Sequence, residues 1–278
     1  MDLQTKQVMR WTYSETGGLN PESFVTPELI EYPTFDSVNG KPRMIPAFYY
    51  KPKTAAPNKP FPVVIRIHGG PESQTGSSFS ALYQYWINEL GVAVIDPNVR
   101  GSDGYGKSYL LMDNGMLRED SVKDIGKLLD WIATRPELDS DRVAVYGGSY
   151  GGYMVLSSAS HYSDRLKCAV DIVGISNFVT FLKTTENYRR DLRRAEYGDE
   201  RDAKMQEFLL SISPIQNVQK IKNAFVCCSG KGMILGFQSP KPDQIVKAVR
   251  NKWKSRPVIC LQITKEMGFK RKNNPGPL

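Results

Sequence analysis

Short apolar runs alternate with stretches of helical periodicity through the middle of the chain. Runs typical of buried strands lie at Pro62–Ile67, Val92–Asp96, Val143–Tyr146 and Ala169–Val173. Helices are expected between them, at Phe79–Leu90, Ser121–Thr134 and Ser149–Ser160. One side of the second of these helices carries an apolar stripe, made of Val122, Ile125, Leu128, Leu129 and Ile132. Such alternation predicts an α/β fold, with a mostly parallel sheet covered by helices on both faces.

A hairpin is expected before the first of these strands. Strand-like stretches at Leu29–Pro33 and Ile45–Tyr50 are separated by Asn39-Gly40, a strong turn signal. Residues 1–24 are polar and show no core of their own. A chain of 278 residues with 40% hydrophobic residues fits one large domain plus a short appendage.

Charge and composition give no indication that the protein binds nucleic acid, a membrane or zinc. The net charge of +8 comes from residues 244–278, which hold nine Lys/Arg and one Glu, so the rest sums to zero. This basic stretch has no nucleic-acid motif, and we expect a solvated face. No apolar run approaches the roughly 20 residues of a membrane span, and the polar amino terminus differs from a signal peptide. The four cysteines lack C-x-x-C spacing, and with only two histidines a zinc site is not expected. Free thiols of this kind are typical of a cytoplasmic protein.

The segment Val143–Tyr153 reads VAVYGGSYGGY and contains the pattern G-x-S-x-G around Ser149. A strand before and a helix after this pattern are typical of a nucleophile elbow. The flanking glycines permit a strained backbone and a close approach of the helix. The Ser149 hydroxyl is then expected at the carboxyl edge of the sheet, where helix N–H groups favour negative charge. The pattern predicts a catalytic nucleophile, in preference to a simple Gly/Ser-rich turn.

A second glycine-rich turn follows an earlier strand, in the sequence IRIHGGPESQ of Ile65–Gln74. In hydrolases with a nucleophile elbow, such a turn supplies one oxyanion-hole N–H and the residue after the nucleophile supplies the other. The expected donors are the backbone N–H groups of Gly69 and Tyr150. A third loop, DPNVRGSDGYG, contains Arg100, Asp103 and Tyr105. These residues either shape a pocket or belong to a loop held by an Arg–Asp pair.

Together, VAVYGGSYGGY, IHGGPESQ, NVRGSDGYGKSY and EDSVKDI resemble the catalytic domain of the prolyl oligopeptidase family, especially its dipeptidyl aminopeptidase and acylaminoacyl-peptidase branches. The resemblance implies an α/β-hydrolase fold over residues 25–278 and serine-dependent hydrolysis of short peptides. It also implies that residues 1–24 are a remnant of the last blade of a β-propeller. By analogy, Phe178, Phe181 and Tyr188 line the substrate pocket together with Tyr105, although core packing explains the two phenylalanines equally well.

A serine hydroxyl needs a base and a carboxylate that orients the base, and the fold places both after Ser149. The only histidines are His68 and His161. His68 precedes the elbow, and His161 ends the helix that begins at Ser149, about 18 Å away along the helix. Neither is expected to serve as the base.

The family resemblance places the catalytic Asp near Ile234, in G-x-N-D-P-R-V-P, and the His at Met267, in G-H-G-F. The chain reads GKGMIL at 230–235 and EMGF at 266–269 instead. Any gene encoding Met233-Ile234 contains an Asp codon one base out of frame. With permitted codons, Gly232–Pro242 reads in that frame as N-D-P-R-V-P-V-S-E-A. We hypothesise that small insertions or deletions altered this region, in nature or in sequencing.

The sequence therefore favours a serine peptidase that acts on a peptide or small ester through a Ser149 acyl-enzyme, with no cofactor. In this copy the triad is incomplete, which indicates an inactive or weakened enzyme. One alternative is a catalytically dead hydrolase-fold protein that binds peptides or a partner. Another is an esterase that uses a different base, such as Lys231. The sequence is also compatible with an oligomer.

Overall fold

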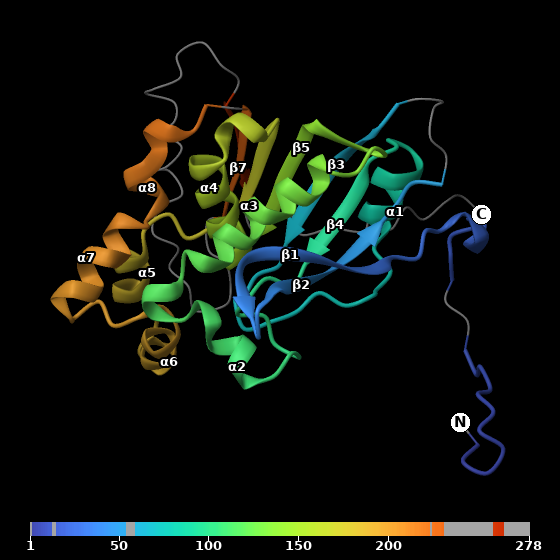
Figure 1. Ribbon diagram of the computed structural model, residues 1–278, viewed down its shortest axis with the longest axis horizontal. Coiled ribbons are helices and arrows are strands. Elements are labelled where there is room, and N and C mark those ends of the chain that lie inside the picture. The colour runs from blue at the N-terminus through green and yellow to red at the C-terminus, as the bar shows by residue number, and fades with distance from the viewer. Residues whose placement is uncertain (1, 13–14, 54–58, 223, 231–257, 264–278) are drawn as a thin grey trace, which may run out of the picture.

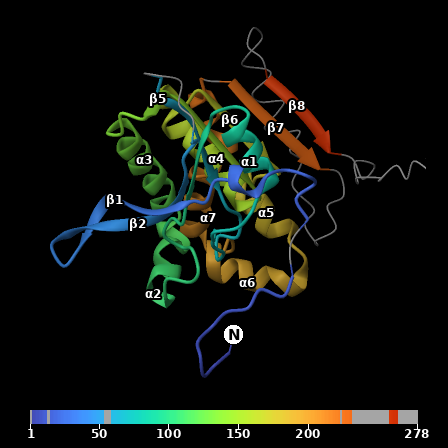
Figure 2. The same cartoon turned by 90° about the vertical axis from the view of Figure 1, so that its right-hand side faces the viewer.

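The computed structural model describes residues 2–12, 15–53, 59–222, 224–230 and 258–263. Within these residues, eight strands form one sheet in the order β1-β2-β4-β3-β5-β6-β7-β8 (Figure 1). The strands are β1 (Glu28–Val38), β2 (Lys41–Tyr50), β3 (Phe61–Ile67), β4 (Ala93–Pro97), β5 (Leu138–Gly148), β6 (Cys168–Ile172), β7 (Ala224–Gly230) and β8 (Val258–Ile263). The hairpin β1–β2 and strands β7 and β8 lie at opposite edges of the sheet (Figure 2).

The sheet is mixed but mostly parallel. Strand β2 pairs antiparallel with both β1 and β4, whereas every pairing from β4 through β3 to β8 is parallel. The central strand β5 pairs Val145 with Ile65 of β3 on one side and with Ala169 of β6 on the other. All the parallel strands therefore point their carboxyl ends toward one edge, which is where ligands bind in such sheets.

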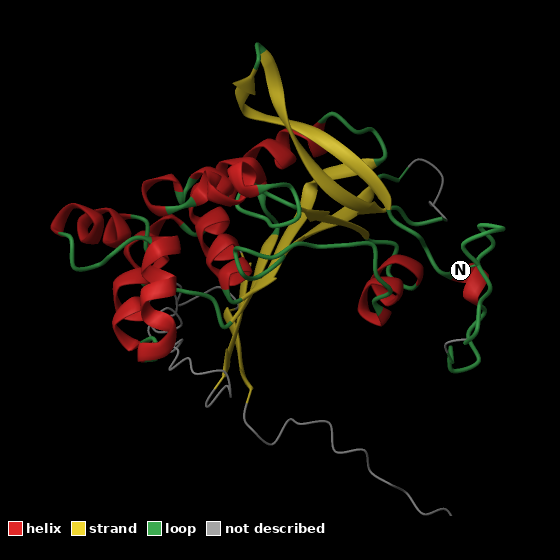
Figure 3. Ribbon diagram, turned by 90° about the horizontal axis from the view of Figure 1, so that it is seen from below, coloured by secondary structure: helices red, strands yellow, loops and turns green. Residues whose placement is uncertain are grey.

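Helices cover both faces of the sheet, as the alternating pattern predicts. Along β4, Ala93 and Ile95 belong to the large core cluster with helices α3 (Asp120–Ala133) and α4 (Tyr150–His161). Val94 packs with Tyr83 and Ile87 of α1 (Ala81–Asn88) in a second cluster. Figure 3 shows most helices on one side of the sheet and the short α1 on the other. The helices are α1 (Ala81–Asn88), α2 (Lys107–Leu110), α3 (Asp120–Ala133), α4 (Tyr150–His161), α5 (Phe178–Thr184), α6 (Asn187–Tyr197), α7 (Ala203–Ser211) and α8 (Pro214–Asn217).

The predicted hairpin and the predicted amphipathic helix are both confirmed. Asn39 and Gly40 take the positive φ values, 52° and 75°, that a tight hairpin turn requires. The apolar stripe of α3 is buried at all five positions, from Val122 to Ile132. Strand β5 begins five residues earlier than predicted, at Leu138, because its polar amino-terminal part still pairs with β3 through Phe61 and Leu138.

The amino-terminal segment extends away from the body of the molecule (Figure 1). Its apolar side chains are exposed, including Leu3 and Trp11, so it buries no core of its own. The assignment of residues 1–24 to a propeller blade and of residues 25–278 to one catalytic domain stays a prediction. No helix in the described part of the chain is long and apolar enough to cross a membrane.

Candidate active site

Ser149 lies at the sharp turn between β5 and α4. Its backbone has φ 57° and ψ −119°, a positive φ that residues with a side chain rarely adopt. The turn is held by two backbone hydrogen bonds, from Ser149 N to Ile172 O at 3.0 Å and from Tyr153 N to Ser149 O at 3.1 Å. Because the side chain of Ser149 is exposed while Tyr150 is buried, the strained turn presents the hydroxyl to solvent.

Glycines allow α4 to begin directly against the end of β3. A Cβ atom on Gly151 would collide with the carbonyl groups of Ile67 and His68, and one on Gly147 would lie 2.6 Å from Gly151 O. These are backbone atoms, so a side chain at either position would push the helix off the sheet. The spacing of the G-x-S-x-G pattern is therefore a packing requirement of the elbow.

The predicted oxyanion turn lies against the elbow. An ideal Cβ atom on Gly69 would lie 3.5 Å from Ser149 Cβ and 4.0 Å from Tyr150 N. The structure thus brings Gly69, Ser149 and Tyr150 together, although they come from two turns 80 residues apart. Backbone N–H groups placed beside a nucleophile can stabilise a developing oxyanion. Their role as oxyanion-hole donors stays a prediction.

The two histidines of the chain have other partners. His68 is buried, with Nδ1 2.8 Å from Gly69 O and Nε2 2.9 Å from Ser102 Oγ. Burial lowers the pKa of its imidazole and thereby favours the neutral ring. His161 ends α4, as expected, and its Nε2 lies 2.7 Å from Glu119 Oε2.

A buried polar cluster that the sequence did not indicate lies behind Tyr150. The Arg118 guanidinium is fully buried and donates to Asp113 Oδ2 at 2.5 Å and to Tyr150 Oη at 3.3 Å. The hydroxyl of Tyr150 also donates to Asp113 Oδ2, at 3.0 Å. Burial raises the pKa of the Asp113 carboxyl to about 6, although Arg118 acts in the opposite direction. Asp113 and Arg118 belong to no motif and lie more than 30 residues before Tyr150 in the sequence, so only the fold reveals the cluster.

The four predicted pocket residues lie in different environments. Phe178 and Phe181 are buried and pack against the ring of Tyr197, with centroids 5.5 and 5.6 Å away, so both contribute to the aromatic core. Tyr188 is exposed on α6. Tyr105 is also exposed, and its hydroxyl accepts a hydrogen bond from Asn98 Nδ2 at 2.8 Å. Substrate contact by these four residues stays a prediction.

The third loop was expected either to shape a pocket or to be held by an Arg–Asp pair. Arg100 forms such pairs, with aspartates outside the loop. Its guanidinium binds Asp124 of α3 at 2.9 Å and Asp36 of β1 at 2.8 Å, and it does not pair with Asp103. The side chain of Arg100 is almost fully buried. This residue therefore anchors the loop to α3 and the hairpin.

The predicted positions of the missing Asp and His, Ile234 and Met267, lie outside the described residues. The same holds for most of the basic stretch and for Lys231. Among the residues that the structure describes, no group of three His, Cys, Asp or Glu side chains could hold a metal ion. Cys168 is half-buried and forms no disulfide with another described residue.

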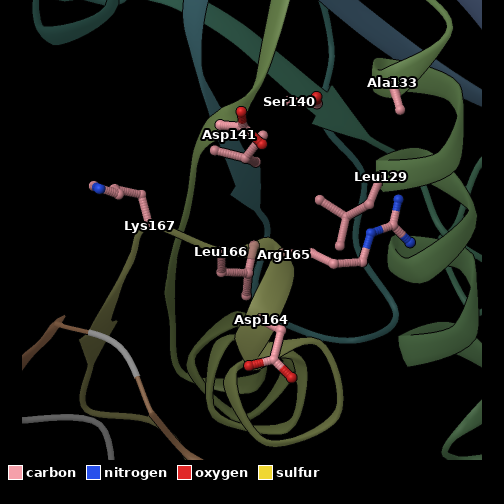
Figure 4. A pocket seen from close by; sticks show the side chains of 9 residues that line it. Leu129, Ala133, Ser140, Asp141, Asp164, Arg165, Leu166 and Lys167 are labelled. Atoms are coloured by element: carbon pink, nitrogen blue, oxygen red, sulfur yellow. The ribbon is translucent and has the colours of Figure 1, made fainter.

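A cavity of about 350 Å³ lies at the amino end of β5, the end of the strand opposite Ser149 (Figure 4). It lies between α3 and the segment that joins α4 to β6. Its walls carry both acidic and basic side chains, namely Asp141, Asp164, Arg165 and Lys167. Arg165 reaches across to Asp130 of α3, at 2.7 Å, so part of this charge is already paired within the protein.

Solved structures share this fold. The chain aligns with a crystal structure of a puromycin hydrolase at a TM-score of 0.78 and 22% identity, covering 89% of this chain and 36% of that one. An acylaminoacyl peptidase of Pyrococcus horikoshii aligns at a TM-score of 0.71 and 20% identity, over 86% and 37% of the two chains. The sheet is therefore that of an α/β hydrolase.

Curated relatives add sequence evidence. Dipeptidyl aminopeptidase BIII of Pseudoxanthomonas mexicana is 32% identical over 77% of this chain and 31% of its own length. Dipeptidyl peptidase family member 6 of Caenorhabditis elegans is 29% identical over 70% of this chain and 27% of its own. The chain thus spans less than a third of the length of these relatives. The family model described as the prolyl oligopeptidase family matches residues 77–232, more than half of the chain. This protein belongs to the prolyl oligopeptidase family of serine peptidases.

Proposed function

We propose that this protein is a hydrolase of short peptides and small esters that forms an acyl-enzyme at Ser149. The observation that carries the proposal is the exposed Ser149 side chain on a strained turn, between the backbone of Gly69 and that of Tyr150. Family membership supports peptides as the substrate class, and the names of the relatives indicate release of short amino-terminal units. In the proposed reaction, the Ser149 oxygen attacks a carbonyl carbon and gives up its proton to water, and the two N–H groups stabilise the oxyanion. The bond from the carbonyl carbon to the leaving group then breaks, which releases the alcohol or amine, and water hydrolyses the acyl-enzyme.

We expect slow turnover, because both histidines of the chain interact with residues other than Ser149. In a complete triad, a histidine takes the serine proton and then protonates the leaving amine. His68 and His161 interact with Ser102 and Glu119, respectively. This observation also supports a second candidate function, the binding of peptides without hydrolysis. The two candidates differ in whether Ser149 forms a covalent bond with the substrate.

Hydrolysis of substrates with different leaving groups tests the proposal. A nitrophenolate group leaves without a proton, whereas a peptide amine needs an acid. We therefore expect nitrophenyl esters of short acyl groups to be cleaved faster than aminoacyl or dipeptidyl anilides. Ser149→Ala should abolish both activities, whereas Ser140→Ala, an exposed serine at the far end of β5, should leave them unchanged. Equal activity of wild type and Ser149→Ala would refute the acyl-enzyme, and peptide binding without any hydrolysis would favour the second candidate.

A further inference from the structure

The carboxyl-terminal end of α6 contacts the turn that follows β3. The hydroxyl of Tyr197 donates a hydrogen bond to Gly70 O at 3.1 Å. Arg193 Nη1 donates to the same oxygen over a longer distance, 3.4 Å. Because the side chain of Tyr197 is only 1% exposed, its hydrogen bond is shielded from competing water. A buried side chain thus fixes the carbonyl group of Gly70, the residue after Gly69.

The same tyrosine contacts the buried cluster behind the elbow. The Arg118 guanidinium lies over the ring of Tyr197, 4.7 Å from its centroid, and over the ring of Tyr150 at 5.2 Å. Its Nη2 donates to Glu196 O at 2.7 Å, which fixes the backbone just before Tyr197. A buried guanidinium between two aromatic faces interacts favourably with both. The positive charge of Arg118 is balanced by Asp113, which also accepts a hydrogen bond from the hydroxyl of Tyr150.

A continuous set of contacts therefore joins the Gly69-Gly70 turn to Tyr150, the residue that follows Ser149. Gly70 O is bonded to Tyr197, whose ring contacts Arg118, and Arg118 is bonded to Tyr150. We propose that Tyr197 is a positioning residue that fixes the Gly69-Gly70 turn relative to Tyr150 and so sets the spacing of the two N–H groups beside Ser149. The proposal rests on the proposed function, since the spacing matters when an oxyanion forms there. Donors contribute to catalysis only when they are held close to the position of the developing charge.

Removal of one hydroxyl group tests the proposal in the chain of 278 residues. Tyr197→Phe keeps the ring, and with it the contacts to Arg118, Phe178 and Phe181, but loses the hydrogen bond to Gly70 O. Tyr32→Phe is the matched control. The hydroxyl of Tyr32 is equally buried and has no hydrogen-bond partner within the described residues.

Two readouts are taken from each variant. The first is amide hydrogen exchange of residues 68–73, which needs no activity. We expect faster exchange in Tyr197→Phe and wild-type exchange in Tyr32→Phe. The second is the kinetics of Ser149 labelling by a fluorophosphonate. We expect the maximum labelling rate of Tyr197→Phe to fall roughly tenfold, with the half-saturating concentration unchanged.

The outcomes separate this proposal from the proposed function. Unchanged exchange of residues 68–73 in Tyr197→Phe would overturn the positioning role, whatever the labelling shows. Faster exchange with an unchanged labelling rate would overturn it as well. If wild-type Ser149 is not labelled at all, the proposed function fails, and the exchange measurement alone decides whether Tyr197 fixes the turn.

Discussion

Glu119 illustrates, at the scale of single residues, how polar groups connect the helices around the site. Its carboxylate accepts hydrogen bonds from Tyr153 Oη at 2.6 Å, from Ser157 Oγ at 3.2 Å and from His161 at 2.7 Å. Burial acts to raise the pKa of Glu119, but the hydrogen bonds from His161 and Tyr153 outweigh it and lower the pKa below 4.5. The ionised carboxylate therefore stabilises the contact between the start of α3 and the length of α4.

The lowered pKa of Glu119 predicts a pH-dependent stability. Its contribution is fully present above the unfolded-state pKa, near 4.5, and is lost as the pH falls through the lower folded-state pKa. We expect Glu119→Gln to reduce the free energy of unfolding by about 1–2 kcal/mol at pH 7 and by progressively less below pH 4.5. Urea unfolding between pH 3 and 7 measures this difference.

Glu207→Gln on α7 is the control for this prediction, because Glu207 is exposed. Its effect should stay within about 0.5 kcal/mol across the range. A constant cost of Glu119→Gln from pH 7 to pH 3 would contradict the proposed role of the ionised carboxylate.

At the scale of single residues, local surroundings were predictable from the sequence and long-range contacts were not. The environment of Ser149 was predictable because a strand, four glycines and a helix start occur together in eleven consecutive residues. The cluster of Asp113, Arg118 and Tyr150 was not, because its members are separated by up to 37 residues and no local pattern relates them. The pairing of Arg100 with Asp124 was also missed, because Asp103 lies only three residues from Arg100 and is a suitable partner by sequence.

The decisive contact at the scale of elements is the approach of α4 to the end of β3. Gly151 lies in the first turn of α4, and its Cα faces the carbonyl groups of Ile67 and His68. Ser149 directly precedes α4, so the positive end of the helix lies beside it and favours negative charge there. Strand and helix positions were predictable from periodicity, and the flanking glycines indicated a close approach of the helix. The atoms that Gly151 meets, the carbonyl groups of Ile67 and His68, became clear only from the arrangement of the backbones.

Substitution of Gly151 tests the contact between α4 and β3. Gly151→Ala places a methyl group into backbone atoms that cannot rotate away, so we expect a loss of about 3 kcal/mol or more in the free energy of unfolding. Gly76→Ala is the control, because its Cβ would meet nothing within 4 Å and its backbone does not need glycine. We expect the control to change stability by less than about 1 kcal/mol. Equal stability of the two variants, measured by chemical denaturation, would show that α4 does not pack as described.

At the scale of the whole molecule, the described residues form the eight-stranded sheet of a hydrolase. The order of the strands up to β6 was predictable, because each contains a short strand-like run bounded by helices or turns. The short helix α2 was not predicted. The family resemblance supplied what periodicity does not, namely the expectation of an Asp near Ile234 and a His at Met267. Residues 234 and 267 lie outside the described residues, so the hypothesis that the catalytic pair is lost rests on the sequence alone.

Ser149 is proposed as the nucleophile, and covalent labelling tests that proposal. The folded protein is incubated with a fluorophosphonate, and the adduct is counted by intact mass and located by peptide mapping. We predict one adduct per chain, on Ser149, that is absent from Ser149→Ala and from the heat-unfolded protein. A folded wild-type protein that acquires no adduct, or an adduct that persists in Ser149→Ala, would contradict the claim.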